Sequence, residues 1–589
     1  MFEERTLGYA LARSLFVFPF LALALLLIVL SGAHRSLSPD LLLSSYAVPG
    51  EGEPLRFCRS RRGSFPLHIV LSGLLLFDQI PHPRLAIPPL SSFTRRDDIF
   101  VAYSVHHSAV TNRSCSAGSS TAEPPKDELL GDLLSVAFDG ASCLSRHQSA
   151  WYRRKPSNHT PSPYLIRRLR RYEALHKKCG PNTELYRKAV EQLVSDTGTA
   201  AAECNYVVWV PSDGLGNRII SIASAFLYAL LNDKVLLLHL TDDMGDLFCE
   251  PFPETSWVLP SDFPVRYSWV LEKDHGYGNL LKNKLLSNDM DTANASLPAF
   301  LYLHLVHSND EFDKMFYCEE GQQLLRKFSW LLLRSNQYFA PAFFLVPEFD
   351  TELSLLFPEK TAVFHHLGTY LFHPSNTVWG YITRYYEAYL ANAKSRLGIQ
   401  IRLFGKADFD SHSDYIIDCA LTKRLLPNVN LTDTALPTIT GAKPRSVLVT
   451  SLRSGYFEKL RNMYYEHATT TGEVISVHQP SHEEKQHSEK LNHNMKAFAE
   501  IYLLSLSDAL ITSPFSTFGY VAQGLGGLRP WLLVRPDDHD LCLHSMSMEP
   551  CFHFPPSYDC KARKKVDIGS VAPYLRHCED FPRGVRLFD

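Results

Sequence analysis

Short apolar runs and longer amphipathic segments alternate through residues 446–534, and this alternation constrains the fold more than any other feature. The runs predict strands and the intervening segments predict helices: strands at 446–450, 473–477, 509–512 and 531–534, helices at 455–465, 489–506 and 518–525. Strands that are joined through helices pair in parallel, with right-handed crossovers. The segment therefore predicts a parallel α/β layer, in which a ligand binds at the carboxyl ends of the strands.

A second strand–loop–helix–strand unit lies earlier in the chain. Residues 206–210 and 235–238 predict strands, and 211–217 form a loop that contains glycine. The helix between them has one apolar face, formed by Ile219, Ile222, Ala223, Phe226 and Leu230. Two such layers predict two facing Rossmann-like domains with a ligand cleft between them, which we place at 126–390 and 391–589.

The start of the body departs from this alternation. The segment ELLGDLLSVAF at 128–138 has an apolar period that predicts a helix. A strongly basic stretch follows, with Arg153, Arg154, Lys155, Arg167, Arg168, Arg170 and Arg171. We interpret it as a solvated helix face, and contact with an anionic lipid or polysaccharide is the alternative.

The N-terminal region contains an uncharged run, LFVFPFLALALLLIVLSGA, at residues 15–33. Its length approaches the ~20 apolar residues that a helix needs to cross a bilayer, so we predict a transmembrane signal-anchor with a cytosolic tail at 1–14. A cleaved signal peptide is the alternative. Residues 34–125 show no sustained amphipathic period and predict a stem. Either interpretation sends the rest of the chain into the lumen.

Glycosylation sequons and cysteines agree with a lumenal body. Four Asn-x-Ser/Thr sequons begin at Asn112, Asn158, Asn294 and Asn430. Ten of the twelve cysteines lie from Cys143 onward, and they could form up to five disulfides in an oxidising compartment. No pair has the Cys-x-x-Cys spacing of a zinc or thioredoxin site. We interpret the cysteines as staples, and a reactive thiol is the alternative.

The net charge gives no reason to expect a nucleic-acid partner. The chain has 59 Lys and Arg against 62 Asp and Glu, which gives a formal charge of −3. Binding to a nucleic-acid backbone requires an excess of positive charge, so this role is unsupported. Hydrophobic residues make up 45% of the chain and charged residues 21%, which excludes wholesale disorder.

The loop DGLGNR at 213–218 lies between a predicted strand and a predicted helix. Gly214 and Gly216 let backbone amides approach a ligand, and the helix N-terminus favours negative charge. The loop lacks the third glycine of the dinucleotide fingerprint and the Lys-Ser/Thr of a Walker loop, which disfavours a dehydrogenase or an NTPase. A tight structural turn with Asn217 capping the helix is the alternative.

Two further segments could bind phosphate. Arg402 follows the strand-like LGIQI, where its guanidinium could pair two phosphate oxygens in a cleft; a surface salt bridge is the alternative. The segment TSPFSTFG at 512–519 joins a predicted strand to a helix, and its hydroxyls and amides could bind a phosphate. Helix capping by Ser516 or Thr517 explains the same pattern.

Long ordered segments together resemble the plant cell-wall fucosyltransferases, whose type members are the xyloglucan α-1,2-fucosyltransferases. The resemblance covers residues 126–589 and excludes the stem. Its main segments are SDGLGNRIISIASAFLYAL at 212–230, DLFCEPFPETSWVLP at 246–260, FHHLGTYLFHPSNTVWGYITRYYEAYL at 364–390, HQPSH at 478–482, STFGYVAQGLGGLRP at 516–530 and SMEPCFHFPPSYDC at 547–560.

The resemblance implies a GT-B-like pair of Rossmann-type domains behind an N-terminal transmembrane helix and stem, in a single-pass type II Golgi membrane protein with a lumenal catalytic domain. It implies inverting transfer of L-fucose from GDP-fucose to a terminal sugar, expected to be galactose in α-1,2 linkage, of a cell-wall polysaccharide such as xyloglucan. Fucosylation of arabinogalactan protein or another wall glycan, and a non-catalytic glycan-binding role, are the alternatives. A second copy of the chain is a candidate partner.

By the same resemblance, Arg402 neutralises the charge that develops on the β-phosphate of departing GDP, helped by Ser516 and Thr517. Phe518 and Gln400 would line the nucleotide site.

The glycine loop would form the edge of the cleft, through Gly214 and Gly216, and Asn217 would orient an acceptor hydroxyl or the donor. No metal or other cofactor is expected, and the Asp-x-Asp pairs at 289–291 and 408–410 are interpreted as solvated acids.

The sequence does not identify a general base. Asp246 and Asp313 are carboxylates within resembling segments, but each could instead cap a helix or pair with a lysine. We prefer a dissociative transfer, in which the acceptor proton leaves through water. Pro514, Phe515 and Arg453 depart from the family pattern beside the expected cleft and leave the acceptor open.

Overall fold

The computed structural model describes most of the chain after residue 129: residues 130–154, 157–195, 203–287, 298–306, 310–403, 409–432, 441–534, 542–557, 559–560 and 564–589. The predicted cytosolic tail, membrane segment and stem lie outside these residues, as do Asn112 and Asn294. Within the described segments, no helix is both long enough and apolar enough to cross a membrane.

The first sheet has four parallel strands in the order β2-β1-β4-β3. Its strands are β1 (Tyr206–Val210), β2 (Val235–Leu238), β3 (Phe300–Leu305) and β4 (Trp330–Ser335). The strands predicted at 206–210 and 235–238 are confirmed, and the predicted helix between them is α5 (Leu215–Leu231). Strands β3 and β4 escape sequence prediction because short helices and long connections interrupt the alternation around them.

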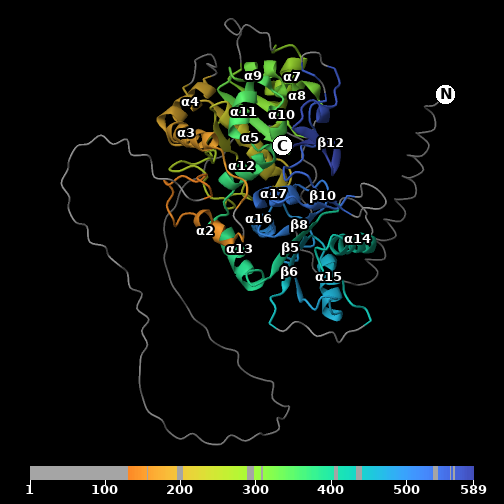
Figure 1. Ribbon diagram of the computed structural model, residues 1–589. Helices are drawn as coiled ribbons and strands as arrows, with labels where there is room; N and C mark the ends of the chain where they lie inside the picture. Colours follow the sequence, from red (N-terminus) through yellow and green to blue (C-terminus); the bar gives the residue numbers. More distant parts are fainter. Residues whose placement is uncertain are drawn as a thin grey trace, which may run out of the picture. The chain divides into compact units, whose positions relative to one another are not determined.

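The second sheet has six strands in the order β10-β9-β8-β5-β6-β7, all parallel to their neighbours except β10, which is antiparallel to β9. Its strands are β5 (Ser395–Ile401), β6 (Arg445–Ser451), β7 (Ile475–His478), β8 (Ala509–Thr512), β9 (Trp531–Leu532) and β10 (Leu543–His544). In Figure 1 the first sheet lies above the strands of the second sheet, three of which are labelled β5, β6 and β8. Its helices are α14 (Phe409–Thr422), α15 (Gly455–Glu466), α16 (Leu491–Ser505) and α17 (Thr517–Gly526). The alternation predicted for 446–534 is therefore confirmed.

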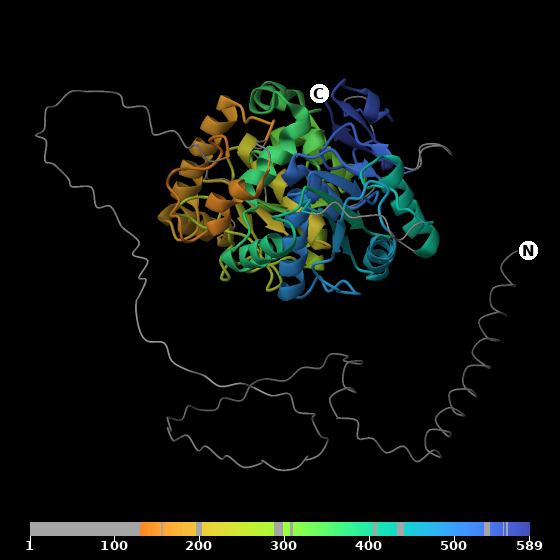
Figure 2. The ribbon, with the colours of Figure 1, turned by 60° about the horizontal axis from the view of Figure 1, so that its bottom comes forward.

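The remaining helices precede the second sheet in the chain. In Figure 2 the orange helices lie beside the yellow strands of the first sheet, whereas the teal helices lie beside the second sheet. These earlier helices are α2 (Leu144–Tyr152), α3 (Pro163–Cys179), α4 (Glu184–Val194), α6 (Trp269–His275), α7 (Tyr277–Lys282), α8 (Glu311–Lys314), α9 (Glu319–Leu325), α10 (Ala340–Phe343), α11 (Asp350–Leu356), α12 (Val363–Leu371) and α13 (Asn376–Tyr389).

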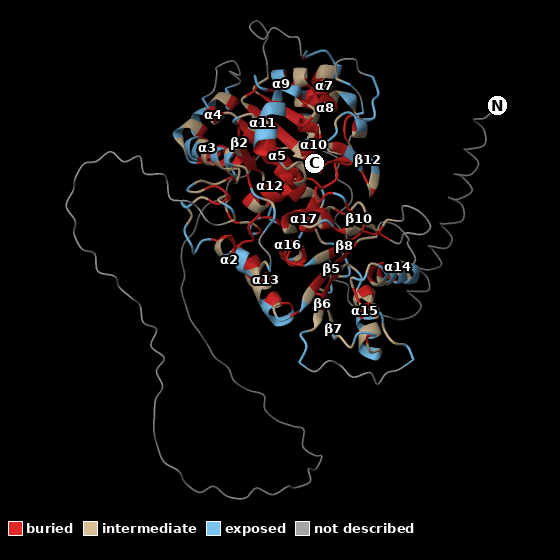
Figure 3. Ribbon diagram, in the orientation of Figure 1, coloured by how far each residue is buried: buried red, intermediate tan, exposed pale blue. Residues whose placement is uncertain are grey.

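One hydrophobic core continues from the first sheet to the second, and α5, α12 and α17 are largely buried in it (Figure 3). Helix α17 packs against α5 and α12 as well as against α16. The packing is close, because a Cβ added to Gly524 would lie 2.2 Å from a ring carbon of Phe364. The two sheets therefore share packed apolar surface, which limits their independent movement.

The C-terminal segment returns to the half that contains the first sheet. It forms an antiparallel pair, β11 (Leu575–Cys578) and β12 (Phe581–Leu587). The Asp589 carboxylate accepts hydrogen bonds from the backbone amides of Lys360 (2.6 Å) and Thr361 (3.2 Å). The end of the chain is thus fastened to residues that precede the second sheet.

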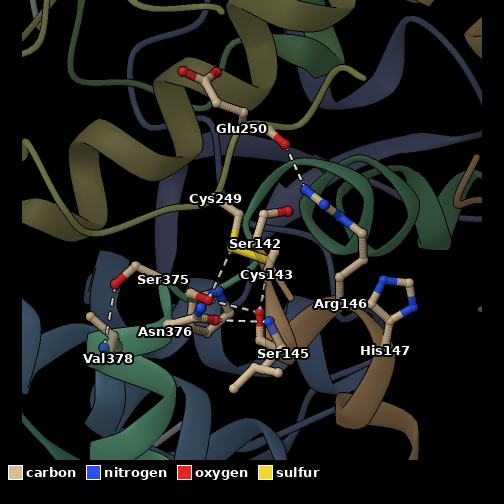
Figure 4. Close-up of a disulfide and its surroundings, with 12 residues drawn as sticks. Ser142, Cys143, Ser145, Arg146, His147, Cys249, Glu250, Ser375, Asn376 and Val378 are labelled. Atoms are coloured by element: carbon tan, nitrogen blue, oxygen red, sulfur yellow. Dashed lines mark hydrogen bonds between the residues drawn. A yellow bond between two sulfur atoms is a disulfide. The ribbon is translucent and has the colours of Figure 1, made fainter. Parts of the chain in front are cut away.

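Disulfides join all ten cysteines of the described residues: Cys143–Cys249, Cys179–Cys204, Cys318–Cys560, Cys419–Cys542 and Cys551–Cys578. The expectation of up to five bonds is confirmed. Figure 4 shows the first of them, where Arg146 donates to the backbone oxygen of Glu250 (2.5 Å). The backbone amide of Leu144 donates to Asn376 Oδ1 (2.8 Å), so the start of α2 is held against α13.

The helix predicted at 128–138 is wrong. Residues 130–142 form turns and irregular backbone instead. Leu130, Gly131 and Asp132 have φ angles of 53°, 68° and 68°, which a right-handed helix does not accept. Leu133 and Leu134 are nevertheless buried, so the apolar spacing indicated burial and not a helix.

The basic stretch is a solvated face only in part. Arg167 and Arg171 are exposed. Arg168, however, is only 8% exposed and forms ion pairs with Asp233 (2.8 Å) and Glu352 (3.0 Å). Because these carboxylates come from distant parts of the chain, the local charge pattern could not distinguish this buried arginine from its solvated neighbours.

A buried carboxyl makes stability depend on pH. Glu549 accepts hydrogen bonds from Tyr338 Oη (2.6 Å) and the Phe364 amide (2.7 Å), and burial raises its pKa from 4.5 to about 8. The folded protein therefore retains a proton that the unfolded chain releases, and its stability falls as the pH rises towards the folded pKa. From about pH 6.5 to pH 8, the wild type should lose about 1–2 kcal/mol more unfolding free energy than Glu549→Gln.

Denaturant titration of both proteins across this range measures the difference. Glutamine resembles the protonated acid in shape and cannot titrate, so it serves as the control. A constant difference between the two proteins at every pH would contradict the assignment.

Candidate functional site

A cavity of about 580 Å³ lies where the carboxyl ends of strands from both sheets meet. Its wall comprises the loops after β1, β4, β5, β6, β7 and β8, residues of α16, and residues 553–554. It is lined by all the residues that the sequence assigned to substrates: Gly214, Gly216, Asn217, Gln400, Arg402, Ser516, Thr517 and Phe518. Distant segments thus converge, because Asn217 and Thr517 are hydrogen-bonded although they lie 300 positions apart in the sequence.

The glycine loop begins α5 without a side-chain cap. Gly214 occupies the N-cap position, so Asn217 does not cap the helix as the alternative interpretation supposed. Instead, Asn217 Oδ1 accepts a hydrogen bond from the Thr517 hydroxyl (3.1 Å), and its Nδ2 donates to the backbone oxygen of Asn336 (3.0 Å). Asn217 therefore connects the loops after β1, β4 and β8 at the cavity wall.

Gly216 leaves no room for a side chain. A Cβ at this position would lie 2.6 Å from Thr517 Oγ1 and 2.9 Å from the Phe518 amide nitrogen. Gly216→Ala should force α17 away from α5 and lower the free energy of unfolding by about 1–3 kcal/mol, as overpacking does. Gly140→Ala is the matched control, because nothing lies within 4 Å of that position. Equal thermal stability of the two variants would contradict the close approach.

Arg402 follows β5, an interior strand of the second sheet, at its carboxyl end. Its backbone amide donates to Ser513 Oγ (2.9 Å), and its Nη2 donates to Gln486 Oε1 (2.8 Å). The side chain is half-buried, and burial lowers the pKa of the guanidinium below its usual range. The guanidinium is thus positioned by neighbouring loops at the cavity, as the cleft hypothesis requires.

The N-terminus of α17 opens on the same cavity. Ser516 occupies the N-cap position, but its side chain accepts no hydrogen bond from the helix. The Thr517 hydroxyl points to Asn217 instead. The hydroxyls of Ser516 and Thr517 therefore do not cap α17. A helix N-terminus carries partial positive charge, which with Arg402 favours an anionic ligand here.

Buried polar atoms in the cavity wall have no hydrogen-bond partner among the described residues. They are Oε1 of Gln337, Oε1 of Gln400 and Oγ1 of Thr450, on side chains that are 2–4% exposed. An unpaired buried polar group costs roughly 1–3 kcal/mol. Three such atoms around one cavity indicate a site organised for a polar ligand.

Sequence reasoning missed the residues after β4. Asn336 Nδ2 donates to the Asp213 carboxylate, and Asn336 also receives the hydrogen bond from Asn217. Asp213 has a φ angle of 61°, an unusual conformation for a residue other than glycine. No local pattern could have found Asn336, because β4 itself was not recognised and the contact is purely tertiary.

The loop between β7 and α16, together with α16 itself, contributes a second group of residues that sequence reasoning missed. Glu483 pairs with Lys496 Nζ (2.5 Å) and His493 (3.2 Å). Glu500 accepts hydrogen bonds from Ser481, and burial raises its pKa to about 7. The HQPSH segment at 478–482 indicated this region without identifying the residues that line the cavity.

The acidic candidates differ in position. Asp410 is interpreted correctly as a solvated acid, because its side chain is 81% exposed. Asp246 is exposed and is not among the lining residues. Asp313 borders a small recess next to the cavity, and burial raises its pKa to about 7. Residues 289–291 and Asp408 lie outside the described residues.

In the described part of the chain, the one group with metal-ligand spacing is Cys551, Cys578 and Asp580. The two cysteines are bonded to each other, and Asp580 forms an ion pair with Arg586 (2.7 Å). Disulfide sulfurs are not the thiolates that bind metals, so this group is a structural staple beside an ion pair.

Comparisons with known proteins agree with the motifs. A family model described as xyloglucan fucosyltransferase matches residues 102–561. A galactoside 2-alpha-L-fucosyltransferase of Arabidopsis thaliana is 52% identical over 470 residues, which cover 78% of this chain and 83% of the relative. A protein of the same description from Pisum sativum is 50% identical over 472 residues, covering 79% and 82%.

Among solved structures, a mutant of Arabidopsis thaliana FUT1 in complex with GDP matches with a TM-score of 0.71. The identity is 51%, and the match covers 78% of this chain and all of that chain.

Proposed function

This chain belongs to the xyloglucan fucosyltransferase family, and from that premise we propose that it transfers L-fucose from GDP-fucose to a terminal galactose of xyloglucan, in α-1,2 linkage. It is a glycosyltransferase, specifically a GDP-fucose-dependent fucosyltransferase with a GT-B-like α/β fold. The family expected from the sequence motifs is therefore confirmed. The acceptor, the stereochemistry and the residue roles belong to the proposal.

The observation that carries the proposal is the convergence of Arg402 and the N-terminus of α17 on one cavity. Breaking the bond between fucose and GDP leaves negative charge on the β-phosphate. Preorganised positive charge at that phosphate lowers the barrier more than it stabilises the bound donor. Arg402 provides a full charge with two parallel donors, and Ser516 and Thr517 add hydroxyl and amide donors. This arrangement supports phosphate neutralisation by the chain's own groups, without a metal ion.

The other lining residues would position the two substrates. Gln400 and Phe518 flank Arg402 and the helix N-terminus, where the nucleotide would lie. Gly214 would form the edge of the cleft, Gly216 would let α17 approach α5 closely, and Asn217 would hold the loops of both halves in place. Attack from the face opposite the departing GDP inverts the configuration at the fucose anomeric carbon.

Incubating the full-length protein with labelled GDP-fucose and separate acceptors tests the proposal. Label on the galactose of xyloglucan, with an α-linkage by NMR and undiminished rate in EDTA, is the expected result. Transfer to arabinogalactan protein instead would replace the acceptor while retaining the reaction. If the protein forms neither labelled glycan nor free fucose, the non-catalytic glycan-binding alternative is favoured.

The identity of the acceptor is the part of the proposal that most needs a direct test. Phe515, which departs from the family pattern, packs its ring against His553 at 4.3 Å between ring centres, and both residues line the cavity. The change from the family pattern at Phe515 therefore lies where an acceptor sugar would bind. For this reason arabinogalactan protein belongs in the acceptor panel.

We further propose a Golgi membrane location, with residues 15–33 as the anchor and the catalytic part in the lumen. The disulfides and the exposed sequon at Asn158 support an oxidising, glycosylating compartment. Protease digestion of intact microsomes tests this topology, because a lumenal body should be cleaved only after detergent is added.

A further inference from the structure

A chain of hydrogen-bonded side chains connects the cavity wall to the buried C-terminal strand. His553 Nε2 lies 3.1 Å from Tyr520 Oη, and Tyr520 Oη donates to Asp580 Oδ2 at 2.6 Å. Asp580 Oδ1 in turn accepts from Arg586 Nη2 at 2.7 Å. The arginine is wholly buried, and only His553 of these four residues lines the cavity.

The chemistry of these groups fixes the direction of the hydrogen bonds. A carboxylate can only accept, so the single proton of Tyr520 Oη is committed to Asp580. The phenol oxygen is then left as an acceptor, and His553 must donate to it from Nε2. A neutral imidazole has one N–H, so its other nitrogen, Nδ1, keeps a lone pair.

Nδ1 is therefore the basic atom that His553 can present to the cavity. The ring makes no second hydrogen bond among the described residues, and burial lowers the pKa of His553 to about 4, which keeps it neutral near pH 7. The groups around it are the Asp580 carboxylate, which favours protonation of His553, and the Arg586 guanidinium, which opposes it.

We propose that His553 is the general base of the fucosyl transfer, and that Tyr520 and Asp580 are positioning residues that hold its Nδ1 unprotonated towards the acceptor. In this step the acceptor oxygen forms its bond to the anomeric carbon of fucose, and the bond from that carbon to the GDP oxygen breaks. The bonding electrons leave with GDP, and the hydroxyl proton moves to Nδ1. The proposal rests on the proposed fucosyl transfer and replaces water as the proton acceptor.

The surroundings of His553 suit this role. Its ring packs between Phe515 (4.3 Å) and Phe581 (4.9 Å), which fixes its plane. Phe515 also directly precedes the residues at the N-terminus of α17, where the diphosphate would lie, and its φ angle of 57° marks a constrained loop. A hydroxyl beside His553 would thus lie near the bond that breaks.

Replacing the base should separate transfer to the glycan from cleavage of the donor. With the full-length protein, His553→Gln should lower kcat for transfer about 10²–10³-fold, as loss of a general base does. GDP affinity by calorimetry and the slow hydrolysis of GDP-fucose by water should stay within about 3-fold, because neither uses the acceptor site. Added imidazole should partly restore transfer in His553→Ala.

Tyr520→Phe tests the positioning residues. It should lower kcat about 10-fold or more with little change in the acceptor KM, because Nε2 loses its fixed partner. Tyr338→Phe is the matched control, because Tyr338 is equally buried and donates to a carboxyl at the same 2.6 Å, but its hydroxyl pairs with Glu549 and not with His553. A purely structural role would reduce thermal stability in both variants and kcat in neither.

Transfer by His553→Gln within about 3-fold of wild type would overturn the proposal. So would equal kcat losses in Tyr520→Phe and Tyr338→Phe. If wild-type protein binds GDP-fucose but transfers fucose to no acceptor, the proposed function fails instead, which is a different outcome from a defect confined to the variants.

Discussion

Replacing Arg402 with lysine should reduce fucose transfer about 10²–10³-fold, the loss seen when one preorganised donor is removed from a developing oxyanion. Lysine retains the positive charge but loses the planar pair of donors that can bind two phosphate oxygens at once. The Arg402 side chain also reaches Gln486, and a lysine ammonium cannot maintain both contacts. The loss should therefore appear mainly in kcat, with GDP affinity falling less.

Initial rates with saturating GDP-fucose and isothermal titration with GDP separate these effects. Arg461→Lys is the control, because Arg461 is exposed on α15 and its side chain contacts Asn462 rather than the cavity. If Arg402→Lys transferred fucose at a rate close to that of Arg461→Lys, Arg402 could not be the group that stabilises the departing phosphate.

Removing the Cys318–Cys560 disulfide should lower the free energy of unfolding by about 3–5 kcal/mol. The bond joins residues 242 positions apart, so it restricts a long loop of the unfolded chain. It also ties the segment before β11 to the start of α9, beside the recess that adjoins the cavity. The double variant Cys318→Ala, Cys560→Ala should therefore unfold at lower denaturant concentration and lose activity at lower temperature.

Removal of Cys179–Cys204 provides the comparison. That bond closes a separation of only 25 positions, and both of its cysteines are buried, whereas Cys560 of the long-range bond is partly buried. Loop-closure entropy predicts a loss smaller by about 1–2 kcal/mol. A larger loss from the short-range pair would show that local strain or packing, and not chain entropy, governs both bonds.

The sequence predicted the part of the site that follows recognisable strands. The loop after 206–210, Arg402 after β5 and the segment after 509–512 each come at the carboxyl end of a strand, and parallel pairing brings such ends to one edge. That geometry made Gly214, Arg402 and Thr517 candidates for a common cleft, and the family resemblance then assigned them to it. The five disulfides were likewise expected in number, but their partners depend on distances that only the fold provides.

The rest of the site depends on contacts between distant segments. Asn336 could not be anticipated because β4 has no alternating pattern beside it. His553 lies in no regular element, and its place depends on strand β12 and on Tyr520 of α17. Arg168 was misjudged for the same reason, since its two carboxylate partners, Asp233 and Glu352, are remote in the sequence. Local periodicity predicts which residues are buried and which element they form. The positions of these three residues depend instead on contacts with distant parts of the chain.

The return of the C-terminal segment sets an order for biosynthesis. Cys318 emerges from the ribosome 242 residues before Cys560, which at ~5–20 residues per second is a delay of roughly 10–50 s. Throughout that interval Cys318 cannot form its native disulfide, and the residues that pack against β12 in the folded protein have no partner strand. Closure of the fold therefore waits for the segment that carries Cys560 and β12, although every residue that lines the cavity precedes that segment in the chain.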